Sequence, residues 1–257
     1  SLPKALVQSG INCAVVMPLY GDIRQDLRDK MTYLTNFSVP VGWRNQYCGV
    51  FSAEVSGVTY YLLDNEYYFK RKGLYGFYDD GERFAFFSRA ILEMLQHIDF
   101  APDIIHTNDW QTALVCVYLN LYYRHLEKFS RIKTAFTIHN IHTVHRCLGE
   151  IEYAGIDAAE FWKNLFYSRP PYDYFESRDT NPVDFLTSGV FASHYINSVS
   201  PTFLEEIVRG WFDFIPGQFR NEVIAKYNAG CACGILNAPD DSYMRWQQGT
   251  FMRLVRM

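Results

Sequence analysis

Residues 102–113 read Pro-Asp-Ile-Ile-His-Thr-Asn-Asp-Trp-Gln-Thr-Ala, and this stretch decides the fold. A short apolar run over 103–107 has the composition of a buried strand, and the segment 110–124 behind it has a helical pattern that Asp109 can cap. A strand that leads directly into a helix is the repeating unit of α/β proteins. The stretch therefore predicts one strand–helix unit of a layered α/β domain.

The same alternation continues outward in both directions. Four of the five expected strands, all but 59–64, are nearly continuous apolar runs, which is typical of parallel strands buried on both faces. The pattern predicts an α/β fold with a Rossmann-like, doubly wound, mostly parallel sheet. The other expected strands are 12–18, 59–64, 134–139 and 195–199, and the other expected helices are 3–9, 82–98 and 202–209.

The order of elements at the two ends of the chain bears on its domain organisation. Residues 3–9 already form a helical pattern that Gly10 can end, and a strand follows from Asn12. A doubly wound domain normally opens with a strand and a tight turn. Residues 251–257 break off inside an apolar pattern. We therefore expect both ends of residues 1–257 to be cut, with the first strand of the domain outside the chain.

Composition excludes several classes of function. The 257 residues carry 24 Lys and Arg against 28 Asp and Glu, a net charge of −4 with no basic run. This argues against nucleic acid or an anionic membrane as a partner. There is no apolar stretch of about 18 residues and the start does not resemble a signal peptide. The six cysteines are scattered, as reduced thiols in a cytosolic protein are. Aromatic residues make up 17% of the chain, which suits sugar recognition or a large aromatic core.

Polar side chains follow each expected strand. In an open α/β sheet, ligands bind outside the carboxyl ends of the strands, so these residues predict a ligand cleft at one edge of the sheet. They are Tyr20 to Asp22, Asp64 and Asn65, His106 to Trp110, His139 and Asn140, and Ser200 and Pro201.

Each of these residues also has a purely structural interpretation. Asp109 could be only the N-cap of its helix, and Asp64 only a turn former. His106 and His139 could be interior histidines bonded to the backbone. The alternatives stay open on the sequence.

Two further patterns invite a metal or redox interpretation. Three histidines stand at three-residue spacing over 139–145, but the run begins at a strand end and no second pair of ligands accompanies it. Cys231 and Cys233 lack the two-residue spacer of a zinc knuckle or redox pair. We expect no metal site.

Several motifs together carry a family resemblance. In the order and at about the spacing found there, the chain resembles the bacterial glycogen synthase and plant starch synthase family. The motifs are Gly73-Leu-Tyr-Gly-Phe-Tyr-Asp-Asp80, Glu82-Arg-Phe-Ala-Phe-Phe-Ser-Arg-Ala90, residues 102–113, Thr137-Ile-His-Asn140, Ser198-Val-Ser-Pro-Thr202 and Gly234-Ile-Leu-Asn237.

The resemblance implies the N-terminal half of a two-domain GT-B glycosyltransferase. Such an enzyme transfers glucose from ADP-glucose to the non-reducing end of an α-1,4-glucan with retention and without a metal or other cofactor. This half would bind the glucan, and the nucleotide sugar would be held with the C-terminal domain. The compartment would be the bacterial cytoplasm, or the plastid stroma for a plant protein.

The resemblance also implies roles for single residues. Asp109 and His139 match catalytic residues of the family, beside the acceptor and the transferred glucose. The substrate-binding residues implied in the same way are Tyr75, Phe77, His106, Asn108, Asn140 and Asn237.

Some positions depart from the family pattern. Thr187 replaces a lysine, residues 141–145 replace a Tyr-Gln-Gly loop, and Ala238 and Pro239 replace a turn glycine after Asn237. The last change restricts the backbone and bears on the role of Asn237. An alternative function is therefore a non-catalytic glucan-binding or interaction module derived from the same domain, and the isolated chain is expected to be inactive.

Overall fold

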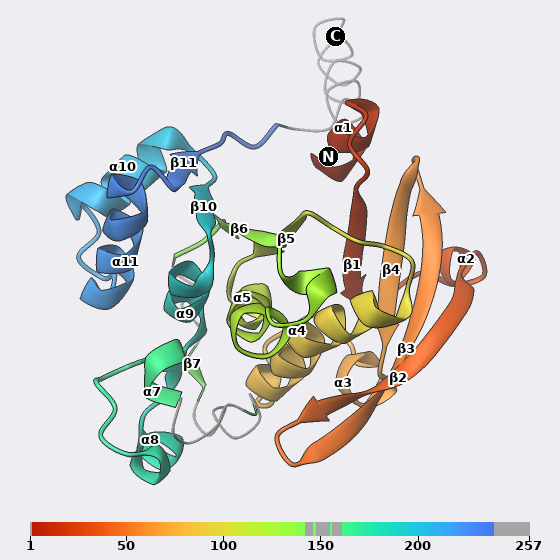
Figure 1. Ribbon diagram of the computed structural model, residues 1–257, viewed down its shortest axis with the longest axis horizontal. Coiled ribbons are helices and arrows are strands. Elements are labelled where there is room, and N and C mark those ends of the chain that lie inside the picture. Colours follow the sequence, from red (N-terminus) through yellow and green to blue (C-terminus); the bar gives the residue numbers. More distant parts are fainter. Residues whose placement is uncertain (1, 142–145, 148–154, 156–160, 239–257) are drawn as a thin grey trace, which may run out of the picture.

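The computed structural model describes residues 2–141, 146–147, 155 and 161–238. Two four-stranded sheets and a small three-stranded sheet are surrounded by helices (Figure 1). The strands are β1 Ala14–Pro18, β2 Thr32–Val41, β3 Arg44–Val55, β4 Val58–Asp64, β5 Ile104–Asn108, β6 Lys133–Ile138, β7 Arg146–Cys147, β8 Phe166–Tyr167, β9 Val183–Asp184, β10 Tyr195–Ser198 and β11 Ala232–Gly234.

Helices connect and cover these strands. The α-helices are α1 Leu2–Gln8, α2 Gln25–Arg28, α3 Glu66–Phe69, α4 Asp80–His97, α5 Ala113–Tyr118, α7 Phe161–Asn164, α8 Tyr174–Thr180, α9 Phe185–Ala192, α10 Pro201–Arg209 and α11 Gly217–Asn228. Short 3₁₀ turns lie at Trp110–Thr112 and Glu127–Phe129, and a π-helical turn at Leu119–Tyr123.

The second sheet, in the order β11-β10-β6-β5, is parallel throughout, as the apolar runs predicted. The helix expected over 110–124 is present, but it begins as a 3₁₀ turn and ends as a π-helical turn around α5. Helix α9 packs closely against α5 and β6, because a Cβ on Gly189 would lie 2.8 Å from Ala113 and Phe136. This sheet and its helices carry the candidate site.

The first sheet, in the order β1-β4-β3-β2, is mixed. Strands β1 and β4 are parallel, whereas β2 and β3 form a long antiparallel hairpin that the sequence analysis did not predict. Helix α4 lies across this hairpin and reaches α5, so it joins the two sheets (Figure 1). The core between α4 and the sheets is rich in aromatic rings, among them Tyr68, Phe69 and Phe86.

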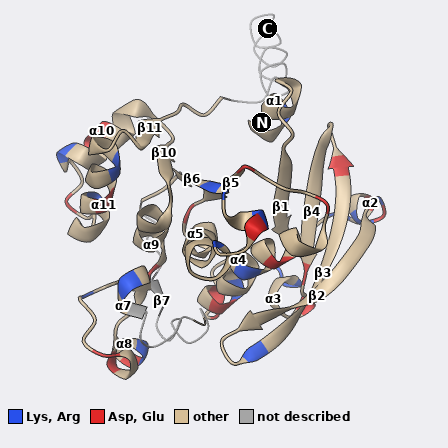
Figure 2. Cartoon of the chain, in the orientation of Figure 1, with Lys and Arg blue, Asp and Glu red and all other residues tan. Residues whose placement is uncertain are grey.

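The outer edges of the sheets and the surface charges complete the description. Among the described residues, β1 and β5 each pair with a strand on one side only, and no residue of α1 is buried. Lys and Arg are spread over many elements and form no single basic stripe (Figure 2). Within the described residues, no helix has the length and apolar character needed to cross a membrane.

Candidate active site

The carboxyl ends of β5, β6 and β10 lie in register. Asn108 pairs with Thr137, and Thr137 pairs in turn with Asn197 on the far side. Because the three strands are parallel, the residues that follow them emerge at the same edge of the sheet. The loops after β5 and β6 are the ones that hold Asn108, Asp109, His139 and Asn140.

Asp109 has an unusual backbone conformation. Its φ of 53° and ψ of −172° lie in a region that residues with a side chain rarely adopt, and apart from Ser56 it is the one non-glycine residue with positive φ among the described residues. Its N–H donates to the carbonyl of Thr137 at 3.0 Å, and its carbonyl accepts from the N–H of Thr112 at 3.3 Å. The surrounding main chain therefore holds a strained residue in place.

The side chain of Asp109 does not cap the helix behind it. Its Oδ1 accepts instead from the main-chain N–H of His139 at 2.8 Å, and it makes no capping bond to the 3₁₀ turn that follows. The interpretation of Asp109 as only an N-cap is therefore wrong. The carboxylate faces the end of β6 rather than its own helix.

The electrostatics of Asp109 reflect its position. Burial raises the pKa of this carboxyl above its usual range, and the hydrogen bonds from the N–H groups of His139 and Asn140, together with the His139 ring, oppose that shift. The group is thus a half-buried carboxylate that is stabilised by main-chain donors rather than by a guanidinium or ammonium group.

His139 and Asn108 lie beside this carboxylate. The imidazole Nε2 of His139 lies 3.0 Å from the Oδ1 of Asn108, so the Nε2–H donates to that oxygen. Both side chains are exposed, as is that of Asn140. The structure thus brings together four of the residues predicted from the sequence.

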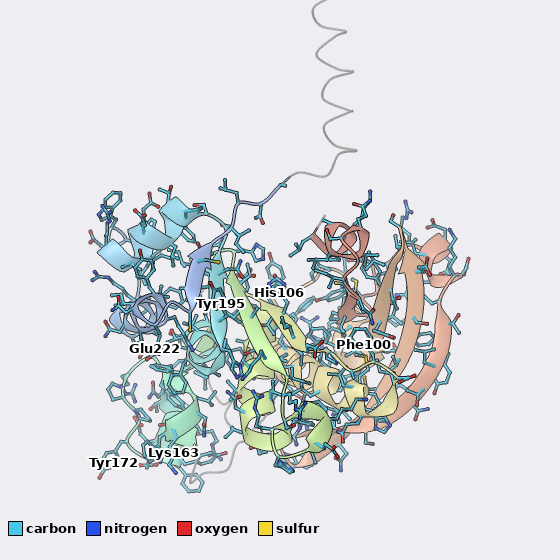
Figure 3. The ribbon with its side chains drawn as sticks, turned by 45° about the horizontal axis from the view of Figure 1, so that its top comes forward. Phe100, His106, Lys163, Tyr172, Tyr195 and Glu222 are labelled. Atoms are coloured by element: carbon cyan, nitrogen blue, oxygen red, sulfur yellow. The ribbon has the colours of Figure 1, made fainter. Side chains whose placement is uncertain are left out.

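His106 lies one pleat deeper, on β5. Its Nε2 is 2.5 Å from the hydroxyl of Thr137, and Figure 3 shows it on the sheet that also carries Tyr195. Part of the ring is exposed, but desolvation of its inner edge and the nearby His139 lower the pKa of His106 below its usual value. The imidazole is therefore neutral near pH 7, and its Nε2 is bonded inside the sheet.

The motif at 73–80 has a different character. Asp80 Oδ2 accepts from the N–H groups of Gly76 and Phe77 at 2.6 and 3.1 Å, which fixes the loop. The guanidinium groups of Arg71 and Arg83 both lie over the Phe77 ring, at 5.2 and 4.6 Å from the ring centroid. The Phe77 ring thus makes contacts with two arginines of its own domain.

Two other predicted substrate-binding residues lie on the surface. The ring of Tyr75 is 61% exposed, and Asn237 is exposed three residues beyond β11. The glycine that opens the Asn237 motif has a packing role, because a Cβ on Gly234 would lie 2.2 Å from the nitrogen of Pro201. Ala238 follows on the surface, and Pro239 lies outside the described residues.

Polar residues at two other strand ends, and Thr187, have structural roles. Asn65 accepts from the N–H of Tyr68 and caps α3, and Ser200 accepts from the N–H of Phe203 and caps α10. Thr187, which replaces the family lysine, is buried and bonds Asp184 through its N–H and its hydroxyl at 3.0 and 2.7 Å.

Neither the histidine run nor the cysteine pair belongs to a cluster of metal ligands among the described residues. His142 and His145 lie outside the described residues, and no group of three or more His, Cys, Asp or Glu residues in the described part could hold a metal ion. Cys13, Cys48, Cys116, Cys231 and Cys233 are free thiols.

The sequence analysis assigned no role to Thr137 or Asn197. Thr137 is 4% exposed, and its hydroxyl donates to the Asn197 Oδ1 at 2.7 Å. The available signal was a pair of polar residues at matching positions near the ends of two apolar strands. The pairing of these two residues can be recognised only when the register of the strands is known.

Comparison with known proteins shows the family of the chain. A family model described as the starch synthase catalytic domain matches residues 1–216. A glycogen synthase of Bacillus cereus (strain B4264) is 41% identical over 254 residues, which are 96% of this chain and 51% of that protein. A glycogen synthase of Caldicellulosiruptor saccharolyticus is 45% identical over 210 residues, covering 80% of this chain and 42% of that protein.

A solved structure extends the similarity to the fold. The catalytic domain of starch synthase IV from Arabidopsis thaliana, bound to ADP and acarbose, matches 94% of this chain with a TM-score of 0.77 and 26% identity, over 47% of its own length. The predicted α/β fold and its GT-B relationship are confirmed. The chain spans about half the length of the curated relatives it matches. On the strength of these matches, the chain belongs to the family of starch synthase catalytic domains.

Proposed function

We propose that this chain is the acceptor-binding half of a glucosyltransferase that moves glucose from ADP-glucose to the non-reducing end of an α-1,4-glucan with retention. The observation that carries the proposal is the strained, half-buried carboxylate of Asp109 beside His139 at the carboxyl edge of a parallel sheet. Membership of the family supports it, because the curated relatives are named glycogen synthase.

Asp109 is suited to act on a sugar that gains positive charge. Its carboxylate accepts from the N–H groups of His139 and Asn140, and its remaining lone pairs can accept from a sugar hydroxyl. A carboxylate held in a low-dielectric position also stabilises an oxocarbenium-like glucose at the moment it separates from the diphosphate. The exposed amides of Asn108 and Asn140 add hydroxyl-binding groups around it.

His139 contributes orientation. Its Nε2–H is bonded to Asn108, which leaves the Nδ1 side of the ring to bond a sugar hydroxyl. The pair would fix the acceptor against Asp109 before the donor binds, and such positioning lowers the barrier to transfer. No metal or other cofactor is needed for these roles.

The donor side of the reaction belongs to parts outside this chain. A departing diphosphate requires cationic and main-chain donors, and we assign these to a C-terminal domain. We expect the protein to work in the cytoplasm.

Glycogen co-sedimentation and transfer of labelled glucose from ADP-glucose test the proposal together. The purified chain should sediment with glycogen but transfer no label above background. Asp109→Asn should weaken co-sedimentation about tenfold, whereas Asp26→Asn, at an exposed ion pair, should leave it unchanged. Turnover by the isolated chain would contradict the assigned division between the halves. Absence of glycogen binding would contradict the acceptor role.

A further inference from the structure

We propose that Thr137 and Asn197 are positioning residues that hold the strained backbone of Asp109 in its productive conformation. This inference deepens the proposed function and rests on it. The juxtaposition that carries it is a hydrogen-bonded chain across three strands, His106–Thr137–Asn197, whose central residue also bonds the main chain of Asp109.

The direction of the hydrogen bonds in this chain can be assigned. The single hydroxyl proton of Thr137 is donated to the Oδ1 of Asn197 at 2.7 Å. The same hydroxyl oxygen must then accept from His106, so the proton of the neutral imidazole is on Nε2. The three side chains are mutually satisfied in one arrangement, and they tie β6 to its neighbour on each side.

Thr137 also reaches Asp109 through its main chain. Its carbonyl accepts from the Asp109 N–H at 3.0 Å, and two residues later the His139 N–H donates to the Asp109 carboxylate at 2.8 Å. The end of β6 therefore contacts Asp109 at both its backbone and its side chain. A shift of β6 relative to β5 would change both bonds at once.

Such a clamp is needed because the conformation of Asp109 is unfavourable by itself. Residues in this backbone region persist only where the surroundings over-determine them. The Thr137 side chain can hold Asp109 in this conformation. It is nearly fully buried between β5 and β10, and its hydroxyl bonds a side chain of each strand. These bonds fix the positions of the strands at the residue whose carbonyl bonds Asp109. Removing the hydroxyl without changing side-chain shape should loosen Asp109 while the sheet stays folded.

Thr134 provides a matched control on the same strand. Its hydroxyl is also buried; it bonds the Nδ1 of His194 at 2.9 Å and accepts from the His194 N–H at 3.0 Å. It lies in the amino-terminal half of β6, three residues before Thr137. A variant at this position removes buried hydroxyl bonds between strands without changing the contacts of Asp109.

The test is amide hydrogen exchange and maltoheptaose titration by NMR on the 257-residue chain. Thr137→Val should raise the exchange rate of the Asp109 amide at least tenfold relative to amides in α4, and it should weaken maltoheptaose binding about tenfold. Thr137→Ser should restore both to within threefold of wild type. Thr134→Val should leave the Asp109 amide unchanged, and Asn197→Ala should reproduce the Thr137→Val result in a second way.

The outcomes separate the inference from the proposed function. If the Asp109 amide exchanges within threefold of wild type in both Thr137→Val and Asn197→Ala, the positioning role is wrong. If Thr137→Val fails to fold, Asn197→Ala decides the question alone. If wild type does not bind maltoheptaose, the proposed function fails, yet the exchange of the Asp109 amide still decides the positioning role.

Discussion

Two motifs of the family resemblance, at residues 73–80 and 102–113, carry acidic side chains, and these carboxylates have different partners in the structure. In the loop at 73–80, Asp79 is bonded to Arg71 at 2.6 and 2.8 Å, and Asp80 forms an ion pair with the fully buried Arg83. Asp109 receives main-chain N–H groups instead. The carboxylates of Asp79 and Asp80 are paired with arginines inside the fold and hold a loop together. The carboxylate of Asp109 is bonded by main-chain donors at a strand end, where it can bind a ligand.

The first prediction concerns the buried ion pair and has the largest expected effect. Asp80→Ala leaves the Arg83 guanidinium buried without its carboxylate and also frees the N–H groups of Gly76 and Phe77. Breaking such a pair destabilises a protein by about 3–5 kcal/mol. Urea denaturation should show this loss. Asp26→Ala, at an exposed pair, should change stability by less than about 1 kcal/mol, and equal effects of the two variants would contradict the distinction between the regions.

The second prediction concerns strain at Asp109. Glycine accepts positive φ without strain, whereas alanine does not, and backbone strain of this kind costs about 1–3 kcal/mol. Asp109→Gly should therefore be more stable than Asp109→Ala by about 1–2 kcal/mol, after allowance for the greater flexibility of glycine in the unfolded chain. Thermal and urea unfolding measure the difference. A more stable alanine variant would show that the residue is not strained.

The third prediction is a smaller dependence of stability on pH. Burial lowers the pKa of His106 and of His194 in the folded protein, so the unfolded chain takes up protons first as the pH falls. The free energy of unfolding should therefore decrease as the pH falls below about 6.5, the ordinary value for histidine. His106→Asn should reduce this decrease, and His106→Asn with His194→Asn should reduce it further. An unchanged slope would contradict the lowered pKa values.

The sequence predicted β5, β6 and β10 of the parallel sheet and missed β11. The strands after residues 103 and 133 are short apolar runs whose identity depends on local composition alone. The hairpin of β2 and β3 was missed because one face is solvated and a register shift between Tyr33 and Thr35 interrupts the alternation on which such a prediction depends.

The sequence predicted that Asn108, Asp109 and His139 lie together, but not how the backbone of Asp109 is held. The grouping of Asn108, Asp109 and His139 follows from the rule that parallel strand ends meet at one edge. The positive φ of Asp109 and its link to Thr137 depend on bonds between strands, which local sequence does not encode. Local sequence likewise does not predict that the Phe77 ring contacts two arginines, one before it and one after it in the chain.

The measurement that tests the central claim most directly is an NMR titration of the 257-residue chain with maltoheptaose and with a cello-oligosaccharide of equal length. The account predicts saturable shifts with maltoheptaose alone, centred on Asn108, Asp109 and His139 rather than on Gly76 and Phe77. The dissociation constant should be on the order of millimolar, about −4 kcal/mol. Equal responses to both sugars, shifts centred on the loop at 73–80, or no response at high millimolar concentration would contradict it.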